Sequence, residues 1–264
     1  ALPISEAGDY LIGFQGDDGS RLTIGGVHGG FSQLVENVTG AGLIGRSNTP
    51  ALNSGSAGAA AHSDPDTSLI FEQPGALAGS TDKAAKATTV GGTKVTVPFL
   101  ASLNPITGEG DVAPFTVEVW AKPVNLTSGA QAAVNSMIAG TNQNPANAND
   151  RSGYLLRLNN ADWQFYLGYT EGAPFYTIAT GAGSAEEGAW QHVVGVWNGT
   201  TQALYVNGTK VAEETPPVPP KANFAAPLLL GKRGFGDWLF NGDLDEVAVY
   251  NTVLSEATIA AHYQ

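Results

Sequence analysis

The chain has 264 residues, of which 42% are hydrophobic and only 14% are charged, so it can bury a large core. Its 24 acidic and 12 basic side chains give a formal net charge of -12, which disfavours nucleic acid and anionic membranes as partners and leaves cations and neutral ligands open, although acidity also serves solubility. Cysteine is absent, which excludes disulfides and thiolate metal sites.

The first part of the chain predicts a hairpin followed by a linker. The start, ALPISEAGDY, lacks a methionine and a basic n-region, which indicates a mature fragment or an excised segment. Residues 9–14 and 21–26 alternate around the turn-forming GDDGS, and residues 47–64 are small, polar and aperiodic. We predict residues 1–64 as a hairpin and linker, either separate or part of the same sandwich, and residues 65–264 as the main domain.

From Thr67 onward, short runs of alternating large apolar residues recur at intervals typical of β-sandwiches. With 34 glycines and 15 prolines, this pattern predicts an all-β antiparallel fold, and no run is long and apolar enough to span a bilayer. Asn207-Gly208 predicts a type I′ hairpin turn. The predicted strands are residues 94–97, 115–120, 154–158, 163–169, 190–197 and 203–211.

Alternation also assigns the faces of the strands. In residues 115–120 both faces are rather apolar, which suits a central strand whose second face is covered or binds a ligand. His192 alternates with apolar residues, so we expect a packed histidine. At the end of the chain, SEATIAAHY predicts one short helix capped by Ser255, with Ile259 and Tyr263 on a shared face.

Several of these segments carry a family resemblance. PFTVEVWAKP, WQHVVGVWNGTTQALYVNGTKV, LLLGKR and FNGDLDEVAVYNTVLSEATIAAHY resemble, in this order, the landmarks of bacterial laminin-G-like domains of the concanavalin-A-like lectin and glucanase superfamily. The resemblance covers roughly residues 67–264. It implies an antiparallel two-sheet jelly-roll sandwich that is extracellular, secreted or on the cell surface, belongs to a larger multidomain protein and frequently binds calcium.

The segment GDLDEVAVYN places three carboxylates within four residues, so their mutual repulsion requires a screening partner. Asp243, Asp245 and Glu246 either cap turns or pair with the nearest bases in the sequence, which are Lys232 and Arg233, or they attract a cation.

The resemblance implies that Asp245 ligates a structural calcium ion together with main-chain carbonyls from the early strands. Calcium takes six to eight oxygen ligands, and a glycine-rich turn at Gly91 and Gly92 is a candidate source of such carbonyls. The sequence therefore predicts a calcium site built from Asp245, Gly91 and Gly92.

Catalysis is not predicted. Glycosidases of this superfamily carry two carboxylates on one strand, and no E-x-D-x-E run occurs here, since Glu118 stands alone in TVEVW. The four histidines are scattered along the chain, and no G-x-S-x-G elbow is present.

Aromatic side chains are the remaining resource for binding, because flat rings beside polar loops suit sugar faces. The stripe of Trp163, Phe165, Leu167 and Tyr169 is predicted to be core. The predicted exposed ligand-binding residues are Arg233, Trp238, Tyr166 and Tyr176.

These observations predict a non-catalytic recognition module, stabilised by calcium, whose partner is a polysaccharide, another glycan or a surface protein. Two alternatives stay open: a structural or adhesive spacer in a larger surface protein, and a carbohydrate-active enzyme.

Overall fold

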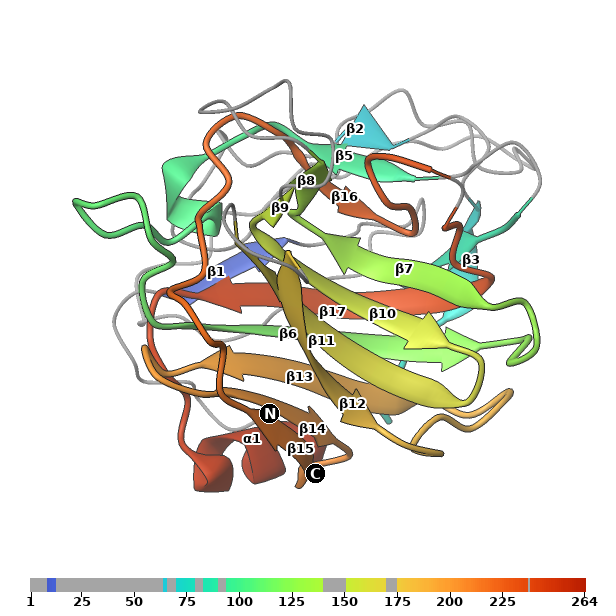
Figure 1. Ribbon diagram of the computed structural model, residues 1–264. Helices are drawn as coiled ribbons and strands as arrows, with labels where there is room; N and C mark the ends of the chain where they lie inside the picture. The colour runs from blue at the N-terminus through green and yellow to red at the C-terminus, as the bar shows by residue number, and fades with distance from the viewer. Residues whose placement is uncertain are drawn as a thin grey trace, which may run out of the picture.

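The computed structural model describes residues 9–12, 64–65, 70–78, 83–89, 94–139, 151–169, 175–236 and 238–264. In these ranges two antiparallel sheets lie face to face, as Figure 1 shows, with β7, β10, β11 and β12 in front of β6, β13 and β17. A short helix, α1 (Glu256–Tyr263), follows the last strand. The predicted all-β, two-sheet jelly-roll sandwich with one C-terminal helix is confirmed.

The rear sheet has eight strands among the described residues and runs β15-β14-β13-β6-β17-β4-β3, with β1 beside β17. Within the same described residues the front sheet has seven strands and runs β12-β11-β10-β7-β16-β5-β2, and β8 pairs with β9 in a separate two-stranded sheet. The strands are β1 (Asp9–Ile12), β2 (Asp64–Pro65), β3 (Ile70–Pro74), β4 (Lys83–Ala87), β5 (Val95–Val97), β6 (Phe115–Pro123), β7 (Ala130–Asn135), β8 (Ile138–Ala139), β9 (Arg151–Ser152), β10 (Tyr154–Asn159), β11 (Asp162–Gly168), β12 (Tyr176–Gly181), β13 (Gln191–Trp197), β14 (Gln202–Val206), β15 (Thr209–Glu214), β16 (Leu228–Leu230) and β17 (Gly242–Tyr250).

Five of the six predicted segments from Thr67 onward each overlap one observed strand, and residues 203–211 cover most of β14, the turn and the start of β15. Asn207 and Gly208 adopt φ angles of 51° and 75°, which confirms the predicted turn between β14 and β15. Strand β1 pairs with β17. The rest of the predicted N-terminal hairpin and the linker at residues 47–64 lie outside the described residues, so the domain boundary stays a prediction.

The main core fills the space between the sheets. Phe115 of β6 contacts Tyr154 of β10 and Phe165 of β11, with ring centroids 4.8 and 6.1 Å apart. Trp163, also fully buried, donates its indole N–H to Gln191 Oε1 at 3.0 Å. The predicted core stripe of β11 is confirmed, since Trp163, Phe165, Leu167 and Tyr169 are at most 2% exposed.

A second apolar cluster lies on the outer face of the rear sheet, beneath α1. Ile259 of the helix is fully buried there, among side chains of β13, β14 and β17. Ser255 accepts a hydrogen bond from the Thr258 N–H at 3.0 Å, which confirms the predicted cap. Tyr263 is 42% exposed and stacks on Trp120. The helix is therefore the cover of this face.

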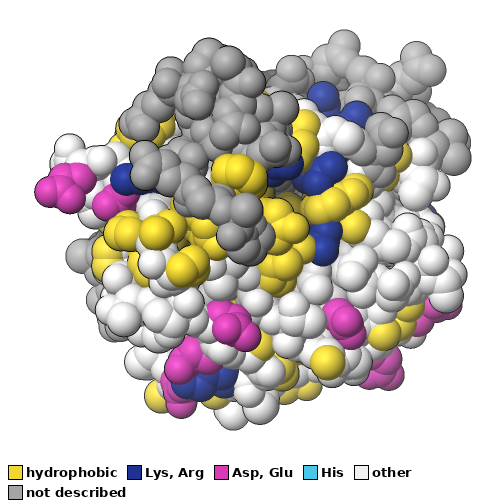
Figure 2. All heavy atoms as spheres, in the orientation of Figure 1, with side chains coloured by type: hydrophobic (Ala, Val, Ile, Leu, Met, Phe, Trp, Pro, Cys, Tyr) yellow, Lys and Arg dark blue, Asp and Glu magenta, His cyan; other side chains and the backbone are white. Residues whose placement is uncertain are grey.

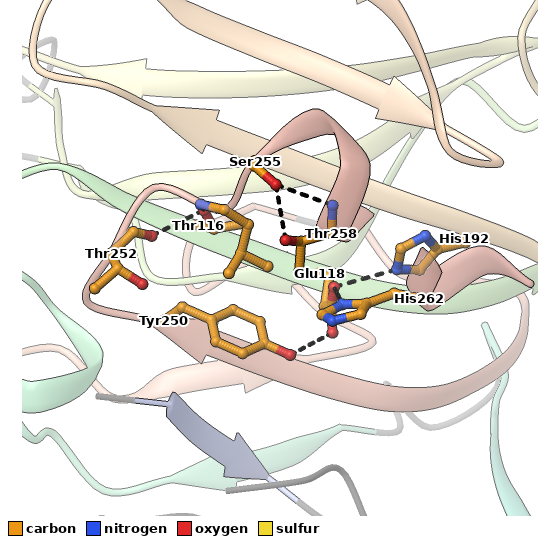
Figure 3. Close-up of polar contacts among 9 residues, drawn as sticks. Thr116, Glu118, His192, Tyr250, Thr252, Ser255, Thr258 and His262 are labelled. Carbon is orange, nitrogen blue, oxygen red and sulfur yellow. Dashed lines mark hydrogen bonds and ion pairs between the residues drawn. The ribbon is translucent and has the colours of Figure 1, made fainter. Parts of the chain in front are cut away.

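Glu118, at the centre of the covered face, is surrounded by three hydrogen-bond donors. Its Oε2 lies 3.2 Å from His192 Nε2 and 2.9 Å from His262 Nδ1, and the Tyr250 hydroxyl donates to its Oε1 at 2.6 Å. Figure 3 shows both imidazoles and the phenol converging on the carboxylate from β13, α1 and β17. An ionised carboxylate only accepts, so the ring nitrogens carry the protons. Glu118, the lone carboxylate of its strand, is thus bound by side chains from three other elements, and the expectation that His192 is packed is confirmed.

Burial alone would raise the pKa of Glu118, but the hydrogen bonds from His192 and His262 outweigh it and lower the pKa to about 2. The charged form is thus favoured by folding. The stabilisation is complete above the ordinary pKa of 4.5 and is lost as the pH falls toward 2.

We expect Glu118→Gln to lower the free energy of unfolding at pH 7 by about 3 kcal/mol, because the amide loses the charge that the three donors stabilise. Between pH 4.5 and 2 the wild-type chain should lose stability more steeply than the variant. Urea unfolding across this pH range measures both effects. Glu109→Gln, on an exposed turn, is the control. Parallel curves for wild type and Glu118→Gln would contradict the assigned role.

Candidate functional site

The outer face of the front sheet carries arginine among aromatic side chains. Along β10, Tyr154, Leu156 and Leu158 enter the main core, so the intervening Arg157 points outward. Tyr166 of β11 belongs to a separate apolar cluster on this outer side. Figure 2 shows basic side chains among hydrophobic ones over the middle of this face. We call this patch the arginine–aromatic surface, and it consists of Arg157, Tyr166, Tyr176, Arg233, Phe235 and Trp238.

Arg157 is the most buried charge of this surface, with 8% of its area exposed. Its Nε donates to Gln164 Oε1 at 2.7 Å, and the register of β10 and β11 sets these two residues opposite each other. Its guanidinium carbon lies 4.4 Å from the ring centroid of Tyr166 and 4.2 Å from that of Trp238. Burial lowers the pKa of Arg157. The guanidinium nevertheless stays charged, because its ordinary pKa exceeds 12.

A short loop holds Arg233 and Trp238 over the sheet. The Arg233 N–H donates to the Trp238 carbonyl at 3.1 Å, so the segment between them closes like a hairpin. The Arg233 guanidinium carbon lies 3.3 Å from the Trp238 ring centroid and 4.2 Å from that of Phe235, and its Nε donates to the Phe235 carbonyl. Arg157 and Arg233 thus share the indole of Trp238, which fixes both guanidinium groups in place.

The structure brings together all four residues that the sequence analysis chose for ligand binding. Tyr166 and Tyr176 have ring centroids 5.3 Å apart, and Arg157 links Tyr166 to Trp238, over which Arg233 lies. Arg233, Tyr176 and Trp238 are half-buried.

The expectation that Tyr166 is exposed is wrong, because only 4% of it is exposed. Arg157 and Tyr176 lie against its ring. Burial raises the pKa of Tyr166 to about 12, although the nearby positive charges of Arg157 and Arg233 lower it in part. The phenol is therefore neutral at physiological pH.

Sequence reasoning missed Arg157, the residue at the centre. The signal was present: YLLRL places one arginine in an otherwise apolar strand, on the face opposite its core leucines. What the sequence could not supply was the register that sets this strand against β11.

The acidic segment lies on the outer face of the other sheet. Leu244 enters the main core, so Asp243 and Asp245 point outward. Asp243 is paired in register with Lys122 on one side and Lys86 on the other, and Lys122 Nζ lies 3.8 Å from its Oδ2. Burial raises the pKa of Asp243, and the two lysines oppose that effect. Asp243 thus pairs with bases from neighbouring strands, and Lys232 and Arg233, the nearest bases in the sequence, are not those partners.

Asp245 links the last strand to the early part of the chain. It is 1% exposed, and its Oδ2 accepts a hydrogen bond from the Ala76 N–H at 2.8 Å. Its Oδ1 accepts from the Glu246 N–H at 3.1 Å. Glu246 is 2% exposed and adopts a φ of 46°, where β17 shifts register against β6. Gly91 and Gly92, the other predicted calcium ligands, lie outside the described residues.

Two adjacent buried carboxylates are a donor set that suits Ca²⁺, which prefers oxygen ligands. Left-handed backbone costs a glutamate on the order of 1 kcal/mol, so the strand accepts a local strain at Glu246, the residue that follows Asp245. The residues at this position therefore fit the metal that the resemblance implies.

Glu118, His192 and His262 also offer three ligand atoms within 4.8 Å of one another. Imidazole and carboxylate suit zinc. Metal-bound histidine normally donates its second ring N–H, however, and His192 Nδ1 is buried without a hydrogen-bond partner among the described residues. We interpret this trio as the hydrogen-bonded attachment of α1.

In the part of the chain that the structure describes, no helix has the length and apolar character needed to cross a membrane.

Several solved structures share the fold at low sequence identity. The binding domain of Paraclostridial Mosquitocidal Protein 1 has a TM-score of 0.57 at 14% identity, over 77% of this chain and 47% of that one. The botulinum neurotoxin serotype D binding domain has 0.58 at 13% identity, over 83% of this chain and 50% of that one. The chain thus spans about half the length of these two neighbours.

A third neighbour is domain 4 of AbnA, an extracellular GH43 arabinanase from Geobacillus stearothermophilus, in complex with arabinotriose. Its TM-score is 0.50 at 16% identity, over 75% of this chain and 82% of that domain. Two of these neighbours are binding domains by name and the third is one domain of a larger enzyme, and at such identities they establish the fold alone. No curated protein sequence matches the chain.

A family model described as the concanavalin A-like lectin/glucanases superfamily, in its laminin G group, matches residues 91–260. This range is more than half of the chain, and it contains most of the strands that build the two sheets. The resemblance predicted from the sequence is confirmed, and the chain belongs to the concanavalin A-like lectin/glucanases superfamily.

Proposed function

We propose that this domain is a non-catalytic, extracellular module of a larger protein that binds carbohydrate through the arginine–aromatic surface and is stabilised by calcium at Asp245. The observation that carries the binding role is that two guanidinium groups pack against one indole. This packing holds the N–H donors of both arginines, five in each, in fixed positions over the sheet. Donors held in place lose little entropy when a ligand binds.

Sugars fit such a surface because they combine hydroxyl groups with flat faces of CH groups. The half-buried rings of Tyr176 and Phe235 offer apolar area, and Gln164 with Thr180 adds an amide and a hydroxyl on the same face. The arabinanase domain crystallised with arabinotriose supports a carbohydrate ligand by fold likeness, and the toxin binding domains support a recognition role. The name of that arabinanase also supports an extracellular setting.

We expect Trp238→Ala to weaken binding to the cognate polysaccharide at least tenfold, because both guanidinium groups lose the ring that orients them. The melting temperature should fall by only a few degrees, since Trp238 is half-buried in a loop. Affinity electrophoresis against soluble polysaccharides, together with thermal unfolding, measures both quantities.

Trp190→Ala is the matched control, because Trp190 is also half-buried but lies beside Lys122 of the rear sheet. A large loss of stability without a loss of binding would show that Trp238 is a packing residue. If the wild-type chain binds nothing on a broad glycan array, the spacer interpretation is favoured.

The calcium site of this proposal is built on Asp245 and Glu246. A bound cation would neutralise their repulsion and reinforce the link to Ala76. Calcium at about a hundred times its Kd would stabilise the folded chain by roughly 2.7 kcal/mol. Chelation should then lower the melting temperature by several degrees.

Asp245→Asn is the informative variant, since the amide oxygen still accepts from Ala76 N–H but the charge is gone. We expect it to remove most of the calcium response measured by calorimetry, whereas Asp111→Asn, which alters the pair with Lys221, should retain it. Identical melting curves with calcium and with chelator, in protein shown to be metal-free at the start, would end the calcium proposal.

A further inference from the structure

Building on the proposed carbohydrate binding, we propose that the ligand is an acidic polysaccharide, whose carboxylate or sulfate group is bound by Arg157 together with Arg233. Two features carry this inference: the burial of the Arg157 charge, and the nature of the groups that lie around it.

Arg157 is more than nine-tenths buried, and burying a charge costs several kcal/mol unless an opposite charge or several hydrogen bonds offset it. Among the described residues its contacts are the neutral amide oxygen of Gln164, the neutral hydroxyl of Tyr166 and two ring faces. No salt bridge between described residues includes Arg157, and the groups that shift its pKa besides burial are phenols. Rings attract a guanidinium by about 0.5 to 2 kcal/mol each, which offsets this cost only in part.

Among the described residues, the other charged groups on these rings are also guanidinium groups. Arg157 and Arg233 both pack against the ring of Trp238. Arg233 also packs against Phe235, and the guanidinium carbon of Arg151 lies 5.0 Å from the centroid of that same Phe235 ring. Three guanidinium groups thus pack against two aromatic rings, although the net charge of the chain is -12. A guanidinium group near Arg157 adds to the cost of burying its charge, and an anion bound by Arg157 would offset that cost.

The phenols do not supply that anion. The charges of both Arg157 and Arg233 act on Tyr166, yet burial raises its pKa to about 12, so it is protonated at physiological pH. Its hydroxyl lies 3.5 Å from Gln164 Oε1, next to the guanidinium of Arg157. An incoming carboxylate or sulfate therefore meets guanidinium donors beside a neutral phenol, and charged donors of this kind favour oxyanions.

The test compares binding of the full chain to two matched pairs of polysaccharides at one ionic strength: polygalacturonate with its methyl ester, and dextran sulfate with dextran. Isothermal titration calorimetry or affinity electrophoresis gives the affinities. We expect at least one acidic polymer to bind tenfold or more tightly than its neutral partner. The pair that shows the difference identifies the group as carboxylate or sulfate.

Arg157→Met should lower the affinity for the acidic polymer by a much larger factor than the affinity for its neutral partner, and so remove most of this preference, whereas Arg157→Lys should retain part of it. Lys210→Met removes the same charge from β15, near α1, and should change nothing. The wild-type comparison needs no variant, so a failure of Arg157→Met to fold leaves the test intact.

Equal affinity for the acidic and neutral polymers would overturn the inference and leave the proposed function standing. An equal loss of both affinities in Arg157→Met would show that Arg157 only supports the surface, and would also overturn it. Binding confined to neutral sugars on a glycan array would also overturn the inference. No binding to any glycan would overturn both the inference and the proposed function.

Discussion

The backbone pairing of β17 is the constraint on which most of this structure depends. It pairs with β6 along one edge, and along the other with β4 near its start and β1 near its end, and every residue in it is buried. Its inward side chains build the core between the sheets. Its outward polar side chains have no access to water, so each needs a partner from another segment. Asp243 forms an ion pair with Lys122, Asp245 accepts a hydrogen bond from the Ala76 N–H, and the Tyr250 hydroxyl donates one to Glu118.

The two outer faces of the sandwich are covered in different ways. The rear sheet is covered by α1, whose Ile259 packs on β13, β14 and β17, and the hydrogen bond between His262 and Glu118 attaches the end of the helix. The front sheet has cover from its own long side chains and from the loop that carries Phe235 and Trp238. A helix that packs tightly leaves little for a ligand, whereas guanidinium groups stacked on rings still present donors.

The sequence was sufficient for what depends on local pattern, and insufficient for what depends on register between distant strands. Alternation located the strands, Asn207-Gly208 fixed a turn, and Ser255 fixed the start of α1, because these features depend on neighbours within a few residues. By contrast, His192 and His262 reach Glu118 from 74 and 144 residues away. Tyr166 was predicted to be exposed for the same reason, because the sequence does not show that Arg157 of the neighbouring strand lies over its ring.

Glu118 and Arg157 make an instructive pair, because each is a charge in the middle of a strand, on an outer face, and nearly inaccessible to water. The carboxylate of Glu118 receives hydrogen bonds from two imidazoles and a phenol, and its lowered pKa shows that folding stabilises the charge. The guanidinium of Arg157, with five N–H donors, has only neutral partners among the described residues, and burial lowers its pKa. Folding therefore completes the surroundings of the first charge and leaves those of the second incomplete. A structural role accounts for Glu118, whereas the buried charge of Arg157 has no opposite charge among its described contacts, and the proposed acidic ligand would supply one.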